Sequence, residues 1–190
     1  KVGKLIVLTG LDGSGTSTVA EHLHMEDKGS TKLKSPPFPF SSNRNEIDEK
    51  VYNVAPEAHY LYYLASNVYL TKLIDRTMEE KDGNIYCVRY FIDTVVHHRA
   101  KGLNVKYEHE TEIYSIRKPD YIFYLDVDEE ERQKRLDQRG RGFLDNQLDD
   151  QELLKRFCEE FNSLESEFIR IQTTNRHIDE IVKEIQGYIK

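Results

Sequence analysis

The sequence predicts an α/β fold of three layers, in which helices cover both faces of a five-stranded parallel β-sheet. Two observations support this fold class. Short apolar segments alternate along the chain with longer segments of helical periodicity, which is the pattern of a parallel sheet. A glycine-rich turn also joins the first apolar segment to the first helical one. Because 190 residues can bury a full core, we expect residues 1–190 to form a single domain.

Strands are predicted where short apolar runs are bounded by polar or turn residues. They fall at residues 4–9, 31–34, 84–88, 121–126 and 168–172. Helices are predicted by the longer patterns between them, at residues 17–26, 55–81, 91–101, 110–116, 129–139, 149–166 and 178–189. The longest helix repeats apolar or aromatic residues at helical spacing from Leu61 to Ile74, so it should lie against the sheet.

The turn after the first strand has the spacing of a phosphate-binding loop. In the pattern G-x-x-x-x-G-K-[ST], Gly10, Gly15 and Ser17 occupy three of the four fixed positions, and Thr16 stands where the lysine belongs. Glycine permits close approach to a ligand, and free N–H groups at a helix start attract phosphate. The expected phosphate-binding residues are Gly10, Gly13, Ser14, Gly15, Thr16, Ser17 and Thr18. A threonine cannot supply the charge that lysine places on the β- and γ-phosphates.

Two irregular segments interrupt the pattern. Residues 35–42 contain three prolines, which predicts either a rigid loop that contacts a ligand or a stiff connection. Residues 139–148 combine glycines with Arg139 and Arg141 between two helices. They are predicted to form a lid that closes over a charged substrate, with an ordinary solvated charge run as the alternative.

The bulk properties exclude several classes of protein. A net charge of −7 argues against broad nucleic-acid or membrane-surface binding. Cys87 and Cys158 lie far apart, so neither a disulfide scaffold nor a metal cluster is expected. No stretch approaches the roughly 18 apolar residues of a membrane span, and the first residues show no signal-peptide pattern. We therefore expect a cytoplasmic protein.

Five stretches carry a family resemblance. They are residues 8–15, Phe38-Pro39, Val88-Arg89-Tyr90, residues 119–141 and residues 171–176. In this order they resemble the thymidylate kinase family of nucleoside monophosphate kinases, over nearly the whole chain. The resemblance implies a P-loop NTPase-type fold with a small arginine-bearing lid at about residues 139–148. It further implies an ATP- and Mg²⁺-dependent kinase with a nucleotide donor, a small-molecule acceptor and a homodimeric assembly.

The resemblance also assigns roles to single residues. Catalytic roles fall to Asp12 near the acceptor and to Arg89, Arg139 and Arg141 as stabilisers of charge, while Ser17 would ligate Mg²⁺. Arg135 and Arg176 are expected on the donor side. The expected acceptor residues are Phe38, Pro39, Tyr63, Asn67 and His98. Because arginine binds phosphate bidentately, the lid arginines are candidates to carry part of the role of the missing lysine.

The phosphoryl-transfer machinery departs from the family pattern at more than Thr16. Val88 replaces an aspartate that lies near the metal and phosphates. Counting back from Val88 places the family's acceptor arginine at Val68 and its stacking aromatic at Leu64. A shift of one residue gives Asn67 and Tyr63, which restores the aromatic but not the cation.

Compensating groups are present nearby. Lys34 and Arg44 are candidates to replace the missing loop arginines, and four tyrosines on the long helix either line a flat pocket or pack. Asp12 and Asp93 are candidates to orient or deprotonate an acceptor hydroxyl, with helix capping as the alternative for Asp93.

The predicted function is a thymidylate kinase-like phosphotransferase that moves the γ-phosphoryl group of ATP to a nucleotide, a nucleoside or a related small molecule. The scarcity of cations on the acceptor side suggests an acceptor with less negative charge than a nucleotide. The alternative is a catalytically weak or inactive nucleotide-binding pseudokinase with a regulatory or assembly role. A threonine introduced at position 16 to trap a complex is disfavoured, because Val88 and Val68 diverge as well.

Overall fold

The sheet of the computed structural model, which describes residues 3–189, has the strand order β2-β3-β1-β4-β5. All neighbouring strands run parallel. The strands are β1 (Leu5–Thr9), β2 (Thr31–Lys34), β3 (Ile85–Val88), β4 (Tyr121–Asp126) and β5 (Ile169–Gln172). Each lies where the apolar runs place it, so the predicted parallel sheet is confirmed.

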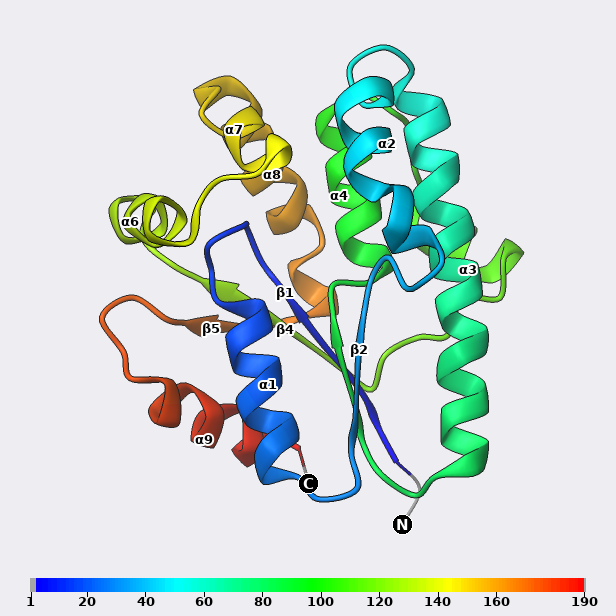
Figure 1. Cartoon of the computed structure of the whole chain (residues 1–190), viewed down its shortest axis with the longest axis vertical. Coiled ribbons are helices and arrows are strands. Elements are labelled where there is room, and N and C mark those ends of the chain that lie inside the picture. The colour runs from blue at the N-terminus through cyan, green and yellow to red at the C-terminus, as the bar shows by residue number, and fades with distance from the viewer. Residues whose placement is uncertain (1–2, 190) are drawn as a thin grey trace.

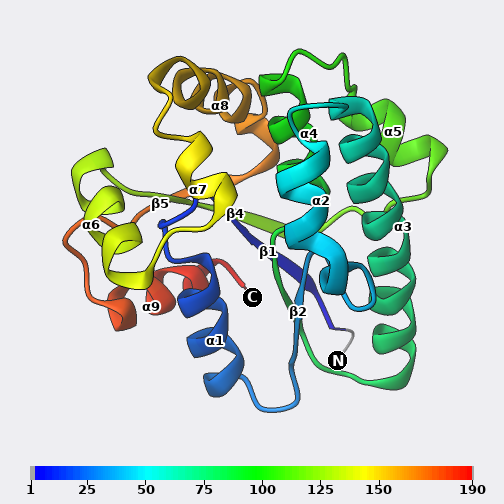
Figure 2. The same ribbon diagram turned by 45° about the horizontal axis from the view of Figure 1, so that its top comes forward.

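Helices cover both faces of the sheet, as the sequence predicts (Figures 1 and 2). Ile6 and Leu8 of β1 pack with α1 (Thr16–Glu26) and α9 (Ile178–Tyr188). Leu5 and Val7 point to the other face, toward the helices of the second layer. These are α3 (Pro56–Glu80), α4 (Phe91–Ala100) and α8 (Gln151–Ser163). Burial on both faces explains why the strands read as continuous apolar runs.

Two short helices have no counterpart among the predicted elements. They are α2 (Arg44–Val51) and α7 (Phe143–Gln147). Helix α2 has little apolar periodicity, but ion pairs join Arg44 to Asp48 and Lys50 to Glu46 at a spacing of four residues. In α7, the Asp145 carboxylate accepts the N–H of Gly142 at 2.7 Å and so caps the helix. Residues 139–148 are therefore partly helical instead of irregular throughout.

Other boundaries shift for identifiable reasons. The helix expected at 110–116 is α5 (Tyr107–Ile113), which starts earlier because Tyr107 is buried and stacks on Phe91 at 5.8 Å. The long helix 149–166 ends at Ser163 and continues as the 3₁₀ turn Glu165–Glu167. The segment 35–42 is irregular until the 3₁₀ turn Phe40–Asn43 begins. Helix α6 (Glu129–Arg139) has the predicted bounds.

The topology brings three chain segments to one edge of the sheet. Because β2, β3 and β1 are neighbours, the residues that follow them lie side by side. The N–H of Arg89 donates to the carbonyl of Leu8, and the N–H of Ser35 donates to the carbonyl of Val88, both at 3.0 Å. The carboxyl ends of the strands are therefore the place where the glycine-rich loop, Arg89 and Lys34 meet. None of the helices within residues 3–189 is long and apolar enough to cross a membrane.

Candidate active site

The phosphate loop connects β1 to α1 in the conformation that its glycines permit. Gly15 precedes α1 with a φ of 97°, in the left-handed region that favours glycine. At Gly10, a Cβ would come within 2.6 Å of the carbonyl oxygen of Leu125. The first N–H groups of α1 have no partner inside the helix, so they are available to an anion. Thr16 is the first residue of α1, and its buried side chain carries no charge.

A cavity of about 720 Å³ extends from this loop to α2, α3, α4 and the segment 139–148. It gathers most of the residues that the sequence predicts for the site. They are Asp12, Gly13, Gly15, Thr16, Ser17, Thr18, Tyr63, Arg89, His98, Arg135 and Arg139. The predicted site residues that do not line it are Gly10, Ser14, Phe38, Pro39, Asn67, Arg141 and Arg176.

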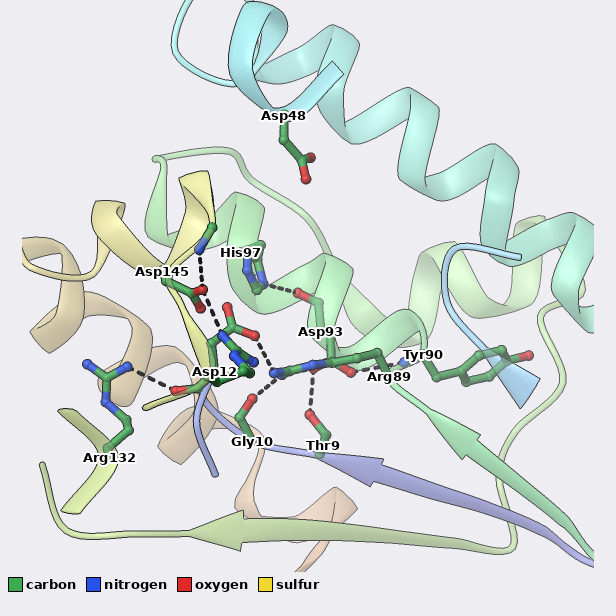
Figure 3. A network of polar contacts seen from close by, with 12 residues as sticks. Thr9, Gly10, Asp12, Asp48, Arg89, Tyr90, Asp93, His97, Arg132 and Asp145 are labelled. Atoms are coloured by element: carbon green, nitrogen blue, oxygen red, sulfur yellow. Dashed lines mark hydrogen bonds and ion pairs between the residues drawn. The ribbon is translucent and has the colours of Figure 1, made fainter. Parts of the chain in front are cut away.

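Arg89 occupies the centre of the polar network (Figure 3). Its guanidinium donates to Asp12 Oδ1 at 2.8 Å, to Asp93 Oδ1 at 2.9 Å and to the carbonyl of Gly10. The backbone of Arg89 is left-handed, with a φ of 66°, directly after the buried Val88. The geometry fixes one buried positive charge beside the phosphate loop, between two carboxylates.

Asp93 has the contacts of a capping residue. One carboxylate oxygen accepts the N–H of Tyr90 at 3.0 Å and completes the cap of α4. The other accepts from Thr9 Oγ1 at 2.7 Å and from Arg89. Both carboxylate oxygens are engaged and the residue is only 6% exposed. Of the two roles considered for Asp93, helix capping is therefore the one that its contacts match. Asp12 instead shares only Oδ1 with Arg89 and lines the cavity.

The Asp12 carboxyl is held in its ionised form. Burial raises the pKa of Asp12, but the charges of Arg89, His97 and Arg44 outweigh burial and lower the pKa below its ordinary value. Arg132 of α6, which is fully buried, donates to the backbone carbonyl of Asp12 at 3.0 Å and so holds the loop in place. A fixed carboxylate at this place can orient an acceptor group or a metal-bound water.

The lowered pKa of Asp12 predicts acid sensitivity. The unfolded chain, with an aspartate pKa of about 3.9, binds a proton before the folded chain does, so this contribution to stability is present above that pH and is lost as the pH falls through the folded value. We expect Asp12→Asn to reduce the slope of unfolding free energy against pH in this acidic window, measured by urea unfolding. Asp82→Asn, at an exposed position, is the control. Equal slopes for wild type and Asp12→Asn would contradict the expectation.

Two cations line the cavity at the end of β2 and on α2. The Nζ of Lys34, at the end of β2, forms no hydrogen bond or ion pair with the residues that the structure describes. Arg44 binds Asp48 Oδ2 at 3.3 Å and Tyr63 Oη at 3.2 Å through Nε alone. The pKa of Lys34 is lowered, mainly by partial burial and to a lesser extent by the positive charges of Arg44 and Arg89. Cations that repel one another at a cavity wall favour a bound anion.

The predicted acceptor residues differ in what they can contact. Tyr63 lines the cavity, whereas buried Asn67 donates to the carbonyl of Tyr63 and to Thr94 Oγ1, both at 2.8 Å, and so joins α3 to α4. His98 lines the cavity with both ring nitrogens engaged, by the carbonyl of Thr94 at 2.6 Å and by His59 at 2.8 Å. Phe38 is 74% exposed, away from the cavity.

The arginines of the helix α6 region have separate environments. Arg139 is half exposed at the cavity and pairs with Asp145 at 2.7 Å. Arg141 pairs with Asp137 and Asp149 outside the cavity lining. Arg135 donates to the carbonyl of Ser14 at 3.3 Å, on the phosphate loop. Arg176 instead binds the carbonyl of Gln172 and Glu184, so the structure does not bring it to the cavity.

Sequence reasoning missed Asp48 and His59 as parts of the cavity wall. Asp48 accepts Arg44 four residues before it on α2, a spacing that is visible in the sequence once that helix is known. His59 had no such signal, because its partners come from α2 and α4. Of the four tyrosines considered on the long helix, only Tyr63 lines the cavity.

Comparison with known proteins agrees with this geometry. The model of the thymidylate kinase family matches residues 8–185. The "Probable thymidylate kinase" of Methanocaldococcus jannaschii is 26% identical over 194 residues, which cover 97% of this chain and 95% of that protein. The thymidylate kinase of Dictyostelium discoideum is 29% identical, over 98% of this chain and 85% of that one.

Solved structures show the same fold. The thymidylate kinase of Candida albicans superposes with a TM-score of 0.78 at 22% identity, covering 98% of this chain and 91% of that one. The enzyme of Ehrlichia chaffeensis superposes over the full length of both chains with a TM-score of 0.72 at 17% identity. The parallel sheet, its phosphate loop and the family match over residues 8–185 lead to one conclusion: the chain belongs to the thymidylate kinase family.

Proposed function

We propose that the protein is an ATP-dependent nucleoside monophosphate kinase, with thymidine monophosphate as the first acceptor to test. One observation carries the proposal. A single cavity runs from the phosphate loop past Arg89 to Lys34 at the end of β2 and Arg44 on α2. Two anionic groups that bind at these two ends would face each other across Arg89. That is the arrangement which transfer of a phosphoryl group between two phosphates requires.

The donor end suits the triphosphate of ATP. The first N–H groups of α1 would point at the phosphates, and Arg135 lies against the loop at Ser14. The side chain of Ser17 is exposed to the cavity and would hold Mg²⁺ together with the donor phosphates. No group of three or more histidine, cysteine, aspartate or glutamate ligands occurs among residues 3–189, which fits Mg²⁺ bound mainly through phosphates and waters. Bound Mg²⁺ would neutralise charge on the β- and γ-phosphates.

The acceptor end supports an acceptor with a phosphate group. The sequence alone suggests an acceptor with less charge, because the family's arginine positions hold Pro37, Ser41 and Val68. In the folded chain, Lys34 and Arg44 supply positive charge from the end of β2 and from α2. The Nη atoms of Arg44 form no hydrogen bond with the described residues, so its fork is available to a phosphate.

The remaining residues would position the substrates and neutralise the charge of the phosphates. Arg89 has its charge fixed by Asp12 and Asp93 where the donor and acceptor ends meet. Arg139 reaches the cavity from the segment 139–148 and would add charge by exchanging Asp145 for a phosphate. Asp12, which lines the cavity and binds Arg89 through Oδ1, would orient the acceptor. Catalysis would therefore come from positioning and charge, with no covalent protein intermediate.

Removal of either acceptor cation tests the proposal. We expect Lys34→Met and Arg44→Met each to raise the KM for thymidine monophosphate about tenfold or more, because a hydrogen bond to a charged group is worth about 1.5–3 kcal/mol. Steady-state kinetics with ATP and Mg²⁺ measures this. The matched control is Lys32→Met, since Lys32 lies on the same strand but pairs with Glu21 away from the cavity.

Two results would contradict the proposal. If wild-type protein binds ATP but phosphorylates nothing in a panel of nucleosides and nucleoside monophosphates, the chain is a nucleotide-binding protein without this activity. If a nucleoside is phosphorylated and neither substitution changes its KM, the acceptor carries no phosphate.

A further inference from the structure

Three buried side chains form a hydrogen-bonded chain behind the acceptor end of the cavity. His98 Nε2 lies 2.8 Å from His59 Nδ1, and His59 Nε2 lies 2.8 Å from Asp48 Oδ1. Asp48 comes from α2, His59 from α3 and His98 from α4, and each is at most 4% exposed. The proposed function uses none of the three directly. Their hydrogen atoms can nevertheless be assigned from the geometry.

His98 carries a hydrogen on Nδ1. Its Nδ1 lies 2.6 Å from the backbone carbonyl of Thr94, and because a carbonyl only accepts, Nδ1 carries a hydrogen. Burial lowers the pKa of His98 to about 3, so the ring is neutral at pH 7. The other nitrogen of a neutral ring is an acceptor. One hydrogen fits between His98 Nε2 and His59 Nδ1, and it belongs to His59 because that ring lies against the Asp48 carboxylate. His59 Nδ1 therefore donates to His98.

Asp48 determines the other nitrogen of His59. Its Oδ2 accepts Arg44 Nε at 3.3 Å, and its Oδ1 accepts Tyr63 Oη at 2.9 Å. A carboxylate that receives donors at both oxygens next to an arginine is ionised, and can only accept. His59 Nε2 must therefore donate to Asp48 as well. A histidine that donates from both ring nitrogens is an imidazolium.

We infer that His59 is a buried imidazolium held between Asp48 and His98, and that it is a positioning residue for Arg44 at the acceptor-phosphate site. Its positive charge compensates Asp48 from the side opposite Arg44. The group of Arg44, Asp48 and His59 then carries one net positive charge beside the cavity. With a neutral His59, the charge of Arg44 would be balanced by Asp48 instead of being available to a phosphate. The role at the phosphate rests on the proposed function, whereas the protonation state does not.

Within residues 3–189, Asp48 is the one anion among the side chains that contact His59. The titratable or charged groups that face it are Arg44 and Asp48 from α2, Tyr52 after α2, Tyr63 from α3 and His98 from α4. Burial raises the pKa values of Tyr52 and Tyr63, so both stay neutral. Asp48 is thus the counter-ion of both cations, and the cluster loses its net charge when His59 loses its proton.

The protonation state is tested on the wild-type protein without a ligand. A long-range ¹H–¹⁵N spectrum at neutral pH, with ring signals assigned through the backbone, reports which nitrogens of the histidines carry hydrogen. We expect two protonated nitrogens in His59 and one, Nδ1, in His98. One unprotonated nitrogen in His59 would overturn the inference. This readout requires neither turnover nor a variant, so it is independent of the proposed function.

The positioning role is tested by binding of thymidine monophosphate in calorimetry, without ATP. We expect His59→Gln to weaken this binding about tenfold, the size of one charge-assisted hydrogen bond, and to leave binding of thymidine unchanged. The control is His109→Gln, on the exposed side of α5. Across pH, the quantity to compare is the Kd of His59→Gln for thymidine monophosphate divided by the Kd of the wild type, because this ratio cancels the titration of the phosphate itself. The ratio should approach one where the spectrum shows His59 losing its proton.

The alternatives give different results. Equal weakening for the nucleoside and its monophosphate would mean that His59→Gln only loosens the pocket, which overturns the positioning role. No difference between His59→Gln and wild type would overturn it as well. If the monophosphate binds as inferred but is never phosphorylated, the proposed function fails while the inference stands.

Discussion

Arg89→Met is expected to destabilise the folded protein by about 3–5 kcal/mol, the cost of breaking a buried ion pair by removing one partner. The guanidinium is mostly buried and is shared by Asp12, Asp93 and the carbonyl of Gly10. Without it, the Asp93 carboxylate, whose side chain is 8% exposed, loses its cationic partner. Urea unfolding followed by circular dichroism measures the loss.

The matched control separates this effect from loss of any arginine. Arg76 lies on the exposed side of α3 and, among the described residues, forms an ion pair only with Glu80, at 2.7 Å. Because exposed ion pairs contribute little, Arg76→Met should leave the unfolding midpoint near that of wild type. Arg89→Lys keeps the charge but loses the guanidinium fork that reaches both carboxylates. Its unfolding midpoint should lie between those of Arg89→Met and Arg76→Met. Equal midpoints for Arg89→Met and Arg76→Met would show that the network around Arg89 is not a source of stability.

Thr16→Lys is expected to raise kcat for phosphoryl transfer by about 100-fold, by analogy with the effect of one transition-state donor. Thr16 begins α1 on the cavity wall, so a lysine there would extend along the donor phosphates. The measurement is the rate of ATP-dependent phosphorylation of thymidine monophosphate at saturating substrates.

Thr16→Met is the control for length without charge, and it should leave kcat near the wild-type value. Equal rates for Thr16→Lys and Thr16→Met would contradict the expectation. They would mean that Arg89, Arg135 and Arg139 already supply the charge that the loop lysine gives elsewhere.

The phosphate loop was predictable because its geometry is local. The conformation of the turn depends on glycines at positions 10 and 15 and on the strand and helix that they join, all within one short segment. The same holds for the five strands, whose burial on both faces produces apolar runs that are visible without a structure. The residues 8–15 therefore carried both the fold class and the expected binding of a nucleotide donor.

The acceptor side was harder to predict because its residues are joined by long-range contacts. Arg89 and Asp12 are 77 residues apart, and His59 and His98 are 39 apart. Helix α2, which presents Arg44 and Asp48, has too little apolar periodicity to be recognised and is supported by packing on α3. The expectation of an acceptor with little charge followed from family positions that hold no arginine. The folded chain places Lys34 and Arg44, which the sequence names as candidate replacements, at the cavity.

The sequence by itself thus determined the sheet, the phosphate loop and the family, since each depends on spacing within a segment or on burial periodicity. Only the tertiary structure decided what faces that loop. It placed Lys34 and Arg44 on the wall of the same cavity, engaged Asp93 in the cap of α4 and joined His59 to Asp48 and His98. The physical reason is that the charge of a site is the sum over side chains that meet in space, and their meeting depends on how the strands and helices pack.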